Sequence, residues 1–477
     1  MFSLSTCVCW IGLGVLACSS FAQAEELPVR SLPREVLKSF EKLGIQERDL
    51  SAHAIPIPPF DGRQLAGYSH AANQLMNPAS VVKVFTTGLA LDRLSVNYRF
   101  KTGFHIERQP VDGVLQGNLY IKGGGDPGLL TSDIWSALRA LRSKGLRTIR
   151  GNMVLDDTVF SDQGMGLSSA DTGVFDDSPY RAYHAQPYGL LLNHGAMMLH
   201  FNVNQNTVQI TPDEAPQDWA FVSELTAVGG ACGAWKNGLD VSLVKKGSNV
   251  VLTVRGNYPR ACGASALPVR IPPQDWLWES WLRECWAQLG GEFSGQVIKG
   301  RTPASTEALY TLEGKPLIEH VKQVNTWSNN VMARHLELAV AGSPNAFNGT
   351  MQDWLRGLGL NTRDWFFENG SGLSRSTRVN AAGLTQFLRS MSVRADFPDY
   401  LASFPQAGVD GTLQRRAKGL EGHAYLKTGS LNGVRALAGY VRDQHGQWWA
   451  VAVMVRGDNA AQAWPAMEKF LEGVYRS

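Results

Sequence analysis

The heptapeptide Asn77-Pro-Ala-Ser-Val-Val-Lys83 decides how the rest of this chain is interpreted. Asparagine followed by proline predicts a helix start, with Asn77 as N-cap, Pro78 at the first helical position and the helix continuing through Leu94. Ser80 and Lys83 are three residues apart and therefore share one face of that helix, where the amine can reach the hydroxyl. A lysine whose pKa is lowered by burial or nearby cations can take the serine proton, which predicts Ser80 as a nucleophile and Lys83 as its base.

The spacing of this serine and lysine is weak evidence by itself, because it recurs at Ser39–Lys42 and Ser242–Lys245. The first pair lies in an expected amphipathic helix and the second in an expected strand, so neither follows a helix start. A helix start offers unpaired backbone N–H groups and the positive end of the helix dipole, which favour negative charge on a serine oxygen. The expected position in the first helical turn therefore singles out Ser80.

A second motif, Ser328-Asn-Asn330, lies between two expected helices over 317–324 and 331–340. A serine and an asparagine in this loop can extend a proton relay and hold a substrate amide. Ser-x-Asn triplets also begin at residues 95, 343 and 430, so alone this one is equally typical of a turn or a helix cap.

A third motif, Lys427-Thr-Gly-Ser430, stands at the end of a short expected strand. The lysine charge and the hydroxyls of Thr428 and Ser430 suit a substrate carboxylate, and Gly429 lets a substrate approach the backbone. A Lys-Thr-Gly triplet also occurs at 101–103, where it begins a β-rich stretch. Together, on helix, loop and strand in this order, the three motifs predict a serine acyl-transfer site.

With these motifs the sequence resembles the penicillin-binding proteins, and within them the low-molecular-mass class C D-alanyl-D-alanine carboxypeptidase/endopeptidase family (peptidase S13). Three further blocks carry the likeness: Gly117–Pro127, Asn369-Gly-Ser-Gly-Leu-Ser-Arg375, and Ala407–Leu413 followed by Arg416. In the second block the family has aspartate where this chain has Asn369, which affects the local contacts of that block. The likeness covers essentially all of the chain after its first 24 residues.

The resemblance implies an α/β (α+β) fold, with a serine β-lactamase/transpeptidase-like domain whose antiparallel sheet is flanked by helices. That domain would comprise 25–104 and 268–477. β-rich inserted domains would fill 105–267, with a third domain nested at about 186–250. The pattern along the chain agrees, because short strands dominate the middle and helices dominate both sides of it.

The resemblance also implies the chemistry. Ser80 would attack the D-Ala–D-Ala amide of a peptidoglycan stem peptide, D-alanine would leave, and water would hydrolyse the acyl-enzyme. The backbone N–H groups of Ser80 and Ser430 would form the oxyanion hole. β-Lactams would acylate Ser80 as inhibitors, and neither a metal nor an organic cofactor is implied. The catalytic residues are then Ser80, Lys83, Ser328 and Asn330, and the substrate-binding residues are Lys427, Thr428, Gly429 and Ser430.

The composition of this 477-residue chain limits the classes of partner that can be predicted for it. Hydrophobic residues make up 44% and charged residues 18%, which is typical of a folded protein with more than one domain. Lys+Arg 45 against Asp+Glu 42 gives a net charge of +3, which is too small to predict nucleic acid or anionic lipid as a partner. The 10 histidines never fall at a metal-ligand spacing, so no metal site is predicted.

The N-terminus predicts export. Residues Met1–Ala24 carry no charge, include the apolar run Val8–Ala17, and end in Ala22-Gln-Ala24, the small-x-small pattern that signal peptidase cleaves. A lipoprotein signal ending at Cys18 is the alternative. With no later segment long and apolar enough to span a membrane, we expect a periplasmic protein, soluble or loosely membrane-associated.

Three cysteines remain after such a signal, Cys232, Cys262 and Cys285. An oxidising compartment permits one disulfide, and we predict Cys232–Cys262 because both residues stand in Ala-Cys-Gly turns. Three free thiols are the alternative.

Three other interpretations compete with this one. Residues 123–128 fit Gly-x-Gly-x-x-Gly after an expected strand, as in dinucleotide binding, but a proline stiffens that loop and an exported protein meets little NAD. A serine β-lactamase uses related motifs, yet the Ser-Asp-Asn triplet of class A enzymes is absent. A non-catalytic protein that binds peptidoglycan or senses β-lactams would keep the fold, but here all three motifs are complete.

Overall fold

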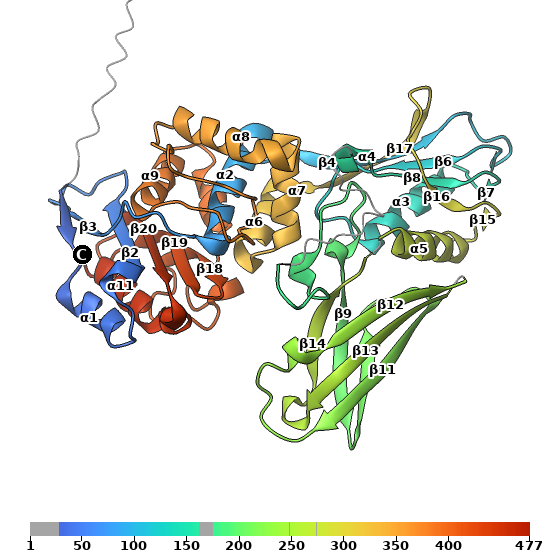
Figure 1. Cartoon of the computed structure of the whole chain (residues 1–477). Coiled ribbons are helices and arrows are strands. Elements are labelled where there is room, and N and C mark those ends of the chain that lie inside the picture. Colours follow the sequence, from blue (N-terminus) through green and yellow to red (C-terminus); the bar gives the residue numbers. More distant parts are fainter. Residues whose placement is uncertain (1–27, 162–174, 248, 273) are drawn as a thin grey trace, which may run out of the picture.

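The computed structural model describes residues 28–161, 175–247, 249–272 and 274–477. The predicted signal peptide lies outside these ranges. Figure 1 shows one body formed by the two ends of the chain and a second, elongated body formed by its middle. Within the described ranges, no helix is both long and apolar enough to cross a membrane.

The first body is built around a six-stranded sheet in which the two ends of the chain meet. The strand order is β1-β3-β2-β20-β19-β18, with β2 antiparallel to β20, and only β1 and β3 run parallel. The bounds are β1 Val29–Ser31, β2 Leu50–Pro56, β3 Gly67–His70, β18 Ala424–Leu431, β19 Val434–Arg442 and β20 Trp448–Arg456.

Both faces of this sheet are covered, as the apolar run of β20 requires. Val451 and Val453 face a cluster that includes α1 and α11, while Ala452 and Met454 belong to the cluster on the opposite face. The helices are α1 Arg34–Glu41, α2 Lys83–Leu94, α6 Leu317–Trp327, α7 Asn330–Ala341, α8 Pro344–Gly357, α9 Ala381–Ser392, α10 Phe397–Ala402 and α11 Trp464–Tyr475. The predicted sheet flanked by helices is confirmed, although the β1–β3 pair departs from a purely antiparallel sheet.

The second body contains a five-stranded sheet of order β16-β8-β6-β4-β17, a small sheet of order β15-β7-β5, and the helices α3 and α5, which pack together. The bounds are β4 Arg99–Ile106, β5 Val114–Leu115, β6 Leu119–Lys122, α3 Thr131–Ser143, β7 Thr148–Ile149, β8 Met153–Asp156, α4 Thr158–Ser161, α5 Gln274–Gln288, β15 Glu292–Phe293, β16 Val297–Lys299 and β17 Glu307–Pro316. The loop 123–128 follows β6 and makes backbone contacts inside the protein, for example from Gly125 N–H to Gly189 O at 3.1 Å.

Two three-stranded sheets project from this second body, at the bottom of Figure 1. Their orders are β10-β9-β14 and β11-β13-β12. The bounds are β9 Ala196–Asn204, β10 Thr207–Pro212, β11 Trp219–Val228, β12 Asp240–Lys246, β13 Asn249–Pro259 and β14 Ser265–Arg270. We call residues 196–270 the nested unit.

The predicted domain boundaries stay predictions, and strand pairing favours a wider insert. β4 pairs with β17, so the chain leaves the first body before Arg99 and returns after Pro316. β14 pairs with β9, which places residue 268 in the nested unit rather than in the first body. We therefore propose an insert over 99–316 with the nested unit at 196–270.

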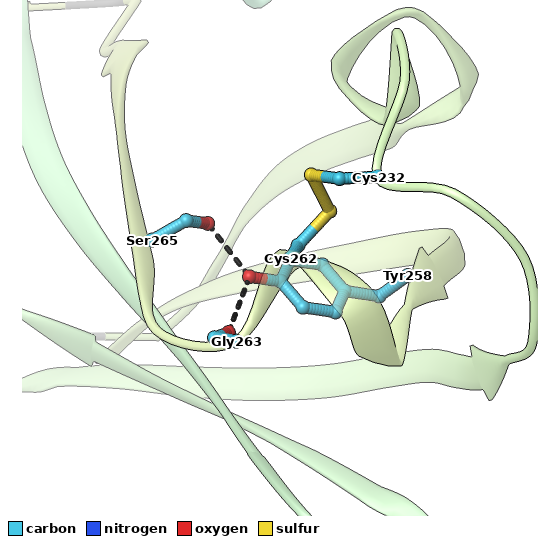
Figure 2. The surroundings of a disulfide bond; sticks show 5 residues. All are labelled: Cys232, Tyr258, Cys262, Gly263 and Ser265. Atoms are coloured by element: carbon cyan, nitrogen blue, oxygen red, sulfur yellow. Dashed lines mark hydrogen bonds between the residues drawn. A yellow bond between two sulfur atoms is a disulfide. The ribbon is translucent and has the colours of Figure 1, made fainter.

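The predicted disulfide Cys232–Cys262 is present and cross-links two connections between strands of the nested unit (Figure 2). It joins the segment between β11 and β12 to the turn that follows β13. Beside it, the Tyr258 hydroxyl donates a hydrogen bond to Gly263 O at 2.9 Å and lies 2.7 Å from Ser265 Oγ. Cys285 is a buried free thiol.

Candidate active site

Lys83 lies at the centre of the contacts between the first two motifs. Its Nζ is 3.1 Å from Ser80 Oγ, donates to Asn330 Oδ1 at 2.7 Å and contacts the backbone carbonyl of Ser371. Three elements therefore converge on one amine: the turn before α2, the start of α7 and the loop around Ser371. The predicted reach of the amine to the serine hydroxyl is present in this geometry.

The environment of Lys83 suits a base. The side chain is fully buried. Burial lowers the pKa of Lys83 well below its usual value, and the charge of Lys427 lowers this pKa further. A lysine that loses its proton this readily can accept the proton of the Ser80 hydroxyl.

The turn that carries Ser80 differs from the predicted helix start. Residues Ala79–Val82 form a 3₁₀ turn and the α-helix begins at Lys83, so the predicted start at Pro78 is wrong by about one turn. Asn77 Oδ1 accepts the N–H of Ala79 at 2.8 Å, and Ala79 has a φ of 46°, in the left-handed region. The residue directly before Ser80 is therefore in a sparsely populated backbone conformation, which is common at functional sites.

Two glycines allow the rest of the site to pack against this turn. A Cβ on Gly372 would lie 2.1 Å from Ala79 O, and one on Gly429 would lie 2.5 Å from Pro78 O. Gly429 was expected to let a substrate approach the backbone. That role stays a prediction, and the lack of a side chain at Gly429 also leaves room for the carbonyl of Pro78.

The second motif is placed by two helix ends. Ser328 caps the C-terminus of α6 with a φ of 62°, and Asn329 caps α7 by accepting the N–H of Met332 at 3.1 Å. Asn330 begins α7, where its amide accepts from Lys83 and donates to Tyr183 O at 3.2 Å. The amide of Asn330 thus holds the base as well as lining the site.

The third motif lies inside a strand rather than at its end, because β18 continues in register with β19 as far as Leu431. Lys427 is fully buried and donates to Ser328 Oγ and to Thr428 O, both at 2.9 Å. Burial lowers the pKa of Lys427 to about 7. Thr428 Oγ1 donates to Thr412 Oγ1 at 2.9 Å.

The three motifs meet at one cavity of about 680 Å³. Its lining includes one residue from each motif: Ser80, Asn330 and Ser430. Lys427 and Ser328 connect the third motif to the second beside this cavity. In the described part of the chain, no group of three or more His, Cys, Asp or Glu residues is arranged to hold a metal ion.

Sequence reasoning missed contributions that come from backbone atoms and from a distant loop. The carbonyls of Ser371 and Tyr183 fix Lys83 and Asn330, and backbone carbonyls leave no trace in a residue pattern. Thr412, which contacts the third motif, lies in the Ala407–Leu413 block that carried the family likeness.

The substitution at Asn369 keeps the contacts that its block needs. Asn369 Oδ1 accepts the N–H groups of Ser371 at 3.1 Å and Gly372 at 3.0 Å, while Nδ2 donates to Leu373 O at 3.1 Å. The amide therefore closes the loop that presents Ser371 O to Lys83.

Known proteins resemble this chain in sequence and in fold. A D-alanyl-D-alanine carboxypeptidase DacB of Haemophilus influenzae is 28% identical over 80% of this chain and 81% of its own length. A D-alanyl-D-alanine carboxypeptidase of an Actinomadura species is 30% identical over 80% of this chain and 73% of its own. The crystal structure of Haemophilus influenzae penicillin-binding protein 4 (dacB) has a TM-score of 0.76 at 24% identity, covering 93% of this chain and 99% of that one.

The family likeness seen in the sequence is confirmed by a family model. The model described as D-Ala-D-Ala carboxypeptidase 3 (S13) matches residues 49–474, which include all three motifs. The match extends through the insert as well as the first body. The chain therefore belongs to the D-Ala-D-Ala carboxypeptidase 3 (S13) family and is a serine carboxypeptidase.

Proposed function

We propose that this protein is an exported DD-peptidase that cleaves the D-Ala–D-Ala bond of peptidoglycan stem peptides, and also cross-link bonds, through an acyl-enzyme on Ser80. The observation that carries the proposal is the fully buried Lys83 amine, 3.1 Å from Ser80 Oγ and held by Asn330. The family and the named carboxypeptidase relatives support the substrate class.

In the first step, Ser80 Oγ attacks the carbonyl carbon of the penultimate D-alanine as its proton passes to Lys83 Nζ. The new C–O bond forms, the C–N bond breaks, and the proton is delivered to the leaving amine. Lys83 can return that proton directly, and Ser328, which accepts a hydrogen bond from Lys427 at 2.9 Å, is a second candidate proton carrier. D-Alanine then departs from an ester on Ser80.

In the second step, water attacks the ester, and Lys83 accepts the proton of that water. The Ser80 oxygen recovers a proton and the shortened peptide leaves. Before the first step, the carboxylate of the C-terminal D-alanine would be held by Lys427 and Thr428. A carboxylate beside Lys427 favours the charged form of a lysine whose pKa in the free protein is about 7.

The substrate carbonyl oxygen becomes negative in both steps. Ser80 and Ser430 line the same cavity, so their backbone N–H groups are the candidates for an oxyanion hole. A β-lactam presents a strained amide and a carboxylate in the same relation and would acylate Ser80. Export through the predicted signal peptide would place this activity in the periplasm.

The test is the intact mass of the mature protein after incubation with benzylpenicillin, alongside Ser80→Ala. A persistent adduct of one equivalent, absent in Ser80→Ala, is expected, together with D-alanine release from a pentapeptide. No adduct with penicillin left intact would refute the acyl-enzyme and favour a binding protein. Penicillin consumed without an adduct would instead indicate a β-lactamase.

A further inference from the structure

A second cavity, of about 460 Å³, adjoins the proposed site and has no role in the steps above. It lies between the turn that joins α6 to α7 and the base of the nested unit. Tyr183 and Asn330 line both cavities, so the two are neighbours at these residues. Ser328 lines only the second one. We call it the α6–α7 groove.

The position of Ser328 indicates which part of a substrate would meet this groove. Ser80 and Ser430 line the first cavity, where the acyl part would be bound. The proposed binding site for the leaving group's carboxylate is Lys427, which donates to Ser328 at 2.9 Å. Any part of a leaving group that extends beyond Lys427 past Ser328 would therefore enter the α6–α7 groove.

The two proposed reactions differ in this part of the substrate. A carboxypeptidase reaction releases free D-alanine, which ends at its carboxylate. Cleavage of a cross-link releases an amine that belongs to a second peptide, and the rest of that peptide continues away from the carboxylate. Only the second reaction needs a binding site beyond Lys427.

The lining of the groove suits a peptide that carries carboxylates. Met198 and Pro268 form an apolar side from the nested unit, and Trp327 stands at the edge with 60% of its surface exposed. Exposed aromatic and arginine side chains are typical of binding surfaces. Arg181 stacks over the ring of Tyr183 at 5.1 Å, and within the described residues no carboxylate pairs with its charge.

We propose that the α6–α7 groove binds the leaving strand of a cross-linked peptide, with Trp327 and Met198 contacting its backbone and Arg181 pairing with one of its carboxylates. The proposal rests on the proposed DD-peptidase function and assigns its cross-link specificity to this groove. Because the nested unit supplies Met198 and Pro268, it also assigns to that unit a part in substrate selection.

The experiment compares three probes on the mature protein: benzylpenicillin, a monomeric pentapeptide and a purified cross-linked peptide dimer. Trp327→Ala and Arg181→Glu should each lower kcat/KM for the dimer by about tenfold, mainly through KM. Penicillin acylation and release of D-alanine from the pentapeptide should stay within about twofold of the wild type. Met198→Trp, which fills the groove, should reproduce this pattern.

Matched controls are Phe60→Ala and Arg108→Glu, an exposed aromatic residue and an exposed arginine away from the groove. Neither should change any of the three reactions. Equal losses on dimer and pentapeptide, or no loss on the dimer in any of the three groove variants, would overturn the assignment. A wild-type protein that fails on all three probes would instead refute the proposed function, so the two failures are distinguishable.

Discussion

The first body and the nested unit bury different kinds of residue. In the first body, Lys83, Lys427 and Glu337 are all fully buried. Among the described residues of 196–270, Thr253 is the single buried residue of the Ser, Thr, Asn, Gln, His or charged types. The nested unit is held together instead by the packed rings of Phe201, Trp235 and Tyr258 and by the disulfide.

The difference shows where the chain accepts a cost in stability. Burying an ionisable group without full compensation is unfavourable, and each such group in the first body shifts its pKa in response. Burial lowers the pKa values of Lys83 and Lys427, and it raises the pKa of Glu337. For Lys83 this shift is what the proposed chemistry uses. Among the described residues of the nested unit, no Lys, Arg, His, Asp or Glu side chain is buried.

The variant Lys83→Met gives the strongest test of this difference between the two regions. If the buried amine serves chemistry and not stability, the rate of penicillin acylation should fall by about 10³-fold or more. The midpoint of urea unfolding should stay the same or rise, since a buried lysine is replaced by an apolar side chain of similar length.

Acylation by stopped-flow fluorescence and unfolding by circular dichroism measure the two effects. Lys42→Met, on the surface of the first body, is the control and should change neither. A variant that acylates normally would show that Ser80 has another base. A large loss of stability would show that Lys83 is structural.

The disulfide provides the matching test in the nested unit. Cys232 and Cys262 are separated by 30 residues, and opening a loop of that size removes about 3–4 kcal/mol of stability in the chain-entropy description. Cys232→Ser/Cys262→Ser should therefore make the nested unit sensitive to protease, while penicillin acylation stays close to normal.

Limited proteolysis read by mass spectrometry locates the cuts. Cuts confined to 196–270 are expected. Cys285→Ser, at the buried free thiol, separates loss of the disulfide from loss of a cysteine. If the double variant lost acylation as well, the two regions would not be independent in stability.

The sequence predicted best where local signals and burial agree. The helices expected over 317–324 and 331–340 are present as α6 and α7, each within three residues of the expected bounds. In α6 the buried residues Leu317, Val321 and Val324 recur at helical spacing. The helix α9 was missed although Asn380 caps it by accepting the N–H of Gly383 at 2.8 Å. Asn380 is a typical N-cap residue, so the sequence contained a signal for the start of this helix.

Other features had no signal in one sequence. The turn that carries Ser80 depends on a positive φ at Ala79, which is not a residue that favours that region. The Ser371 carbonyl reaches Lys83 from 288 positions away. The insert boundaries depend on the pairing of β4 with β17, and strand patterns predict strands better than their partners.

A third test uses the pH dependence of stability. An exposed lysine in the unfolded chain has a pKa near 10.4, whereas the folded pKa of Lys427 is about 7. Between these values the unfolded state binds more protons, so the free energy of unfolding should rise with pH by at most about 1.4 kcal/mol per unit. Below about pH 7 both states hold the proton and this contribution to the slope disappears.

Urea unfolding between about pH 7.5 and about pH 9.5 measures this slope, and Lys427→Met should reduce it. Lys83 contributes in the same direction, so some slope should persist in that variant. Lys418→Met, at an exposed lysine, should leave the slope unchanged. An identical slope in wild type and Lys427→Met would mean that Lys427 keeps its proton in the folded protein.

The smallest expected effect concerns Asn369, where the family has aspartate. Asn369→Asp keeps an oxygen to accept the N–H groups of Ser371 and Gly372 but replaces the donor to Leu373 O with a second oxygen. The lost donor and a carboxylate facing a carbonyl should cost about 1–2 kcal/mol. Because the Ser371 carbonyl should still reach Lys83, the acylation rate should change by less than about threefold.

Asn369→Ala, which removes both the acceptor and the donor, should lower stability and acylation together. If Asn369→Asp proved as inactive as Asn369→Ala, the amide donor itself would be needed to position the base, and this one residue would couple the stability of its loop to the chemistry on Ser80.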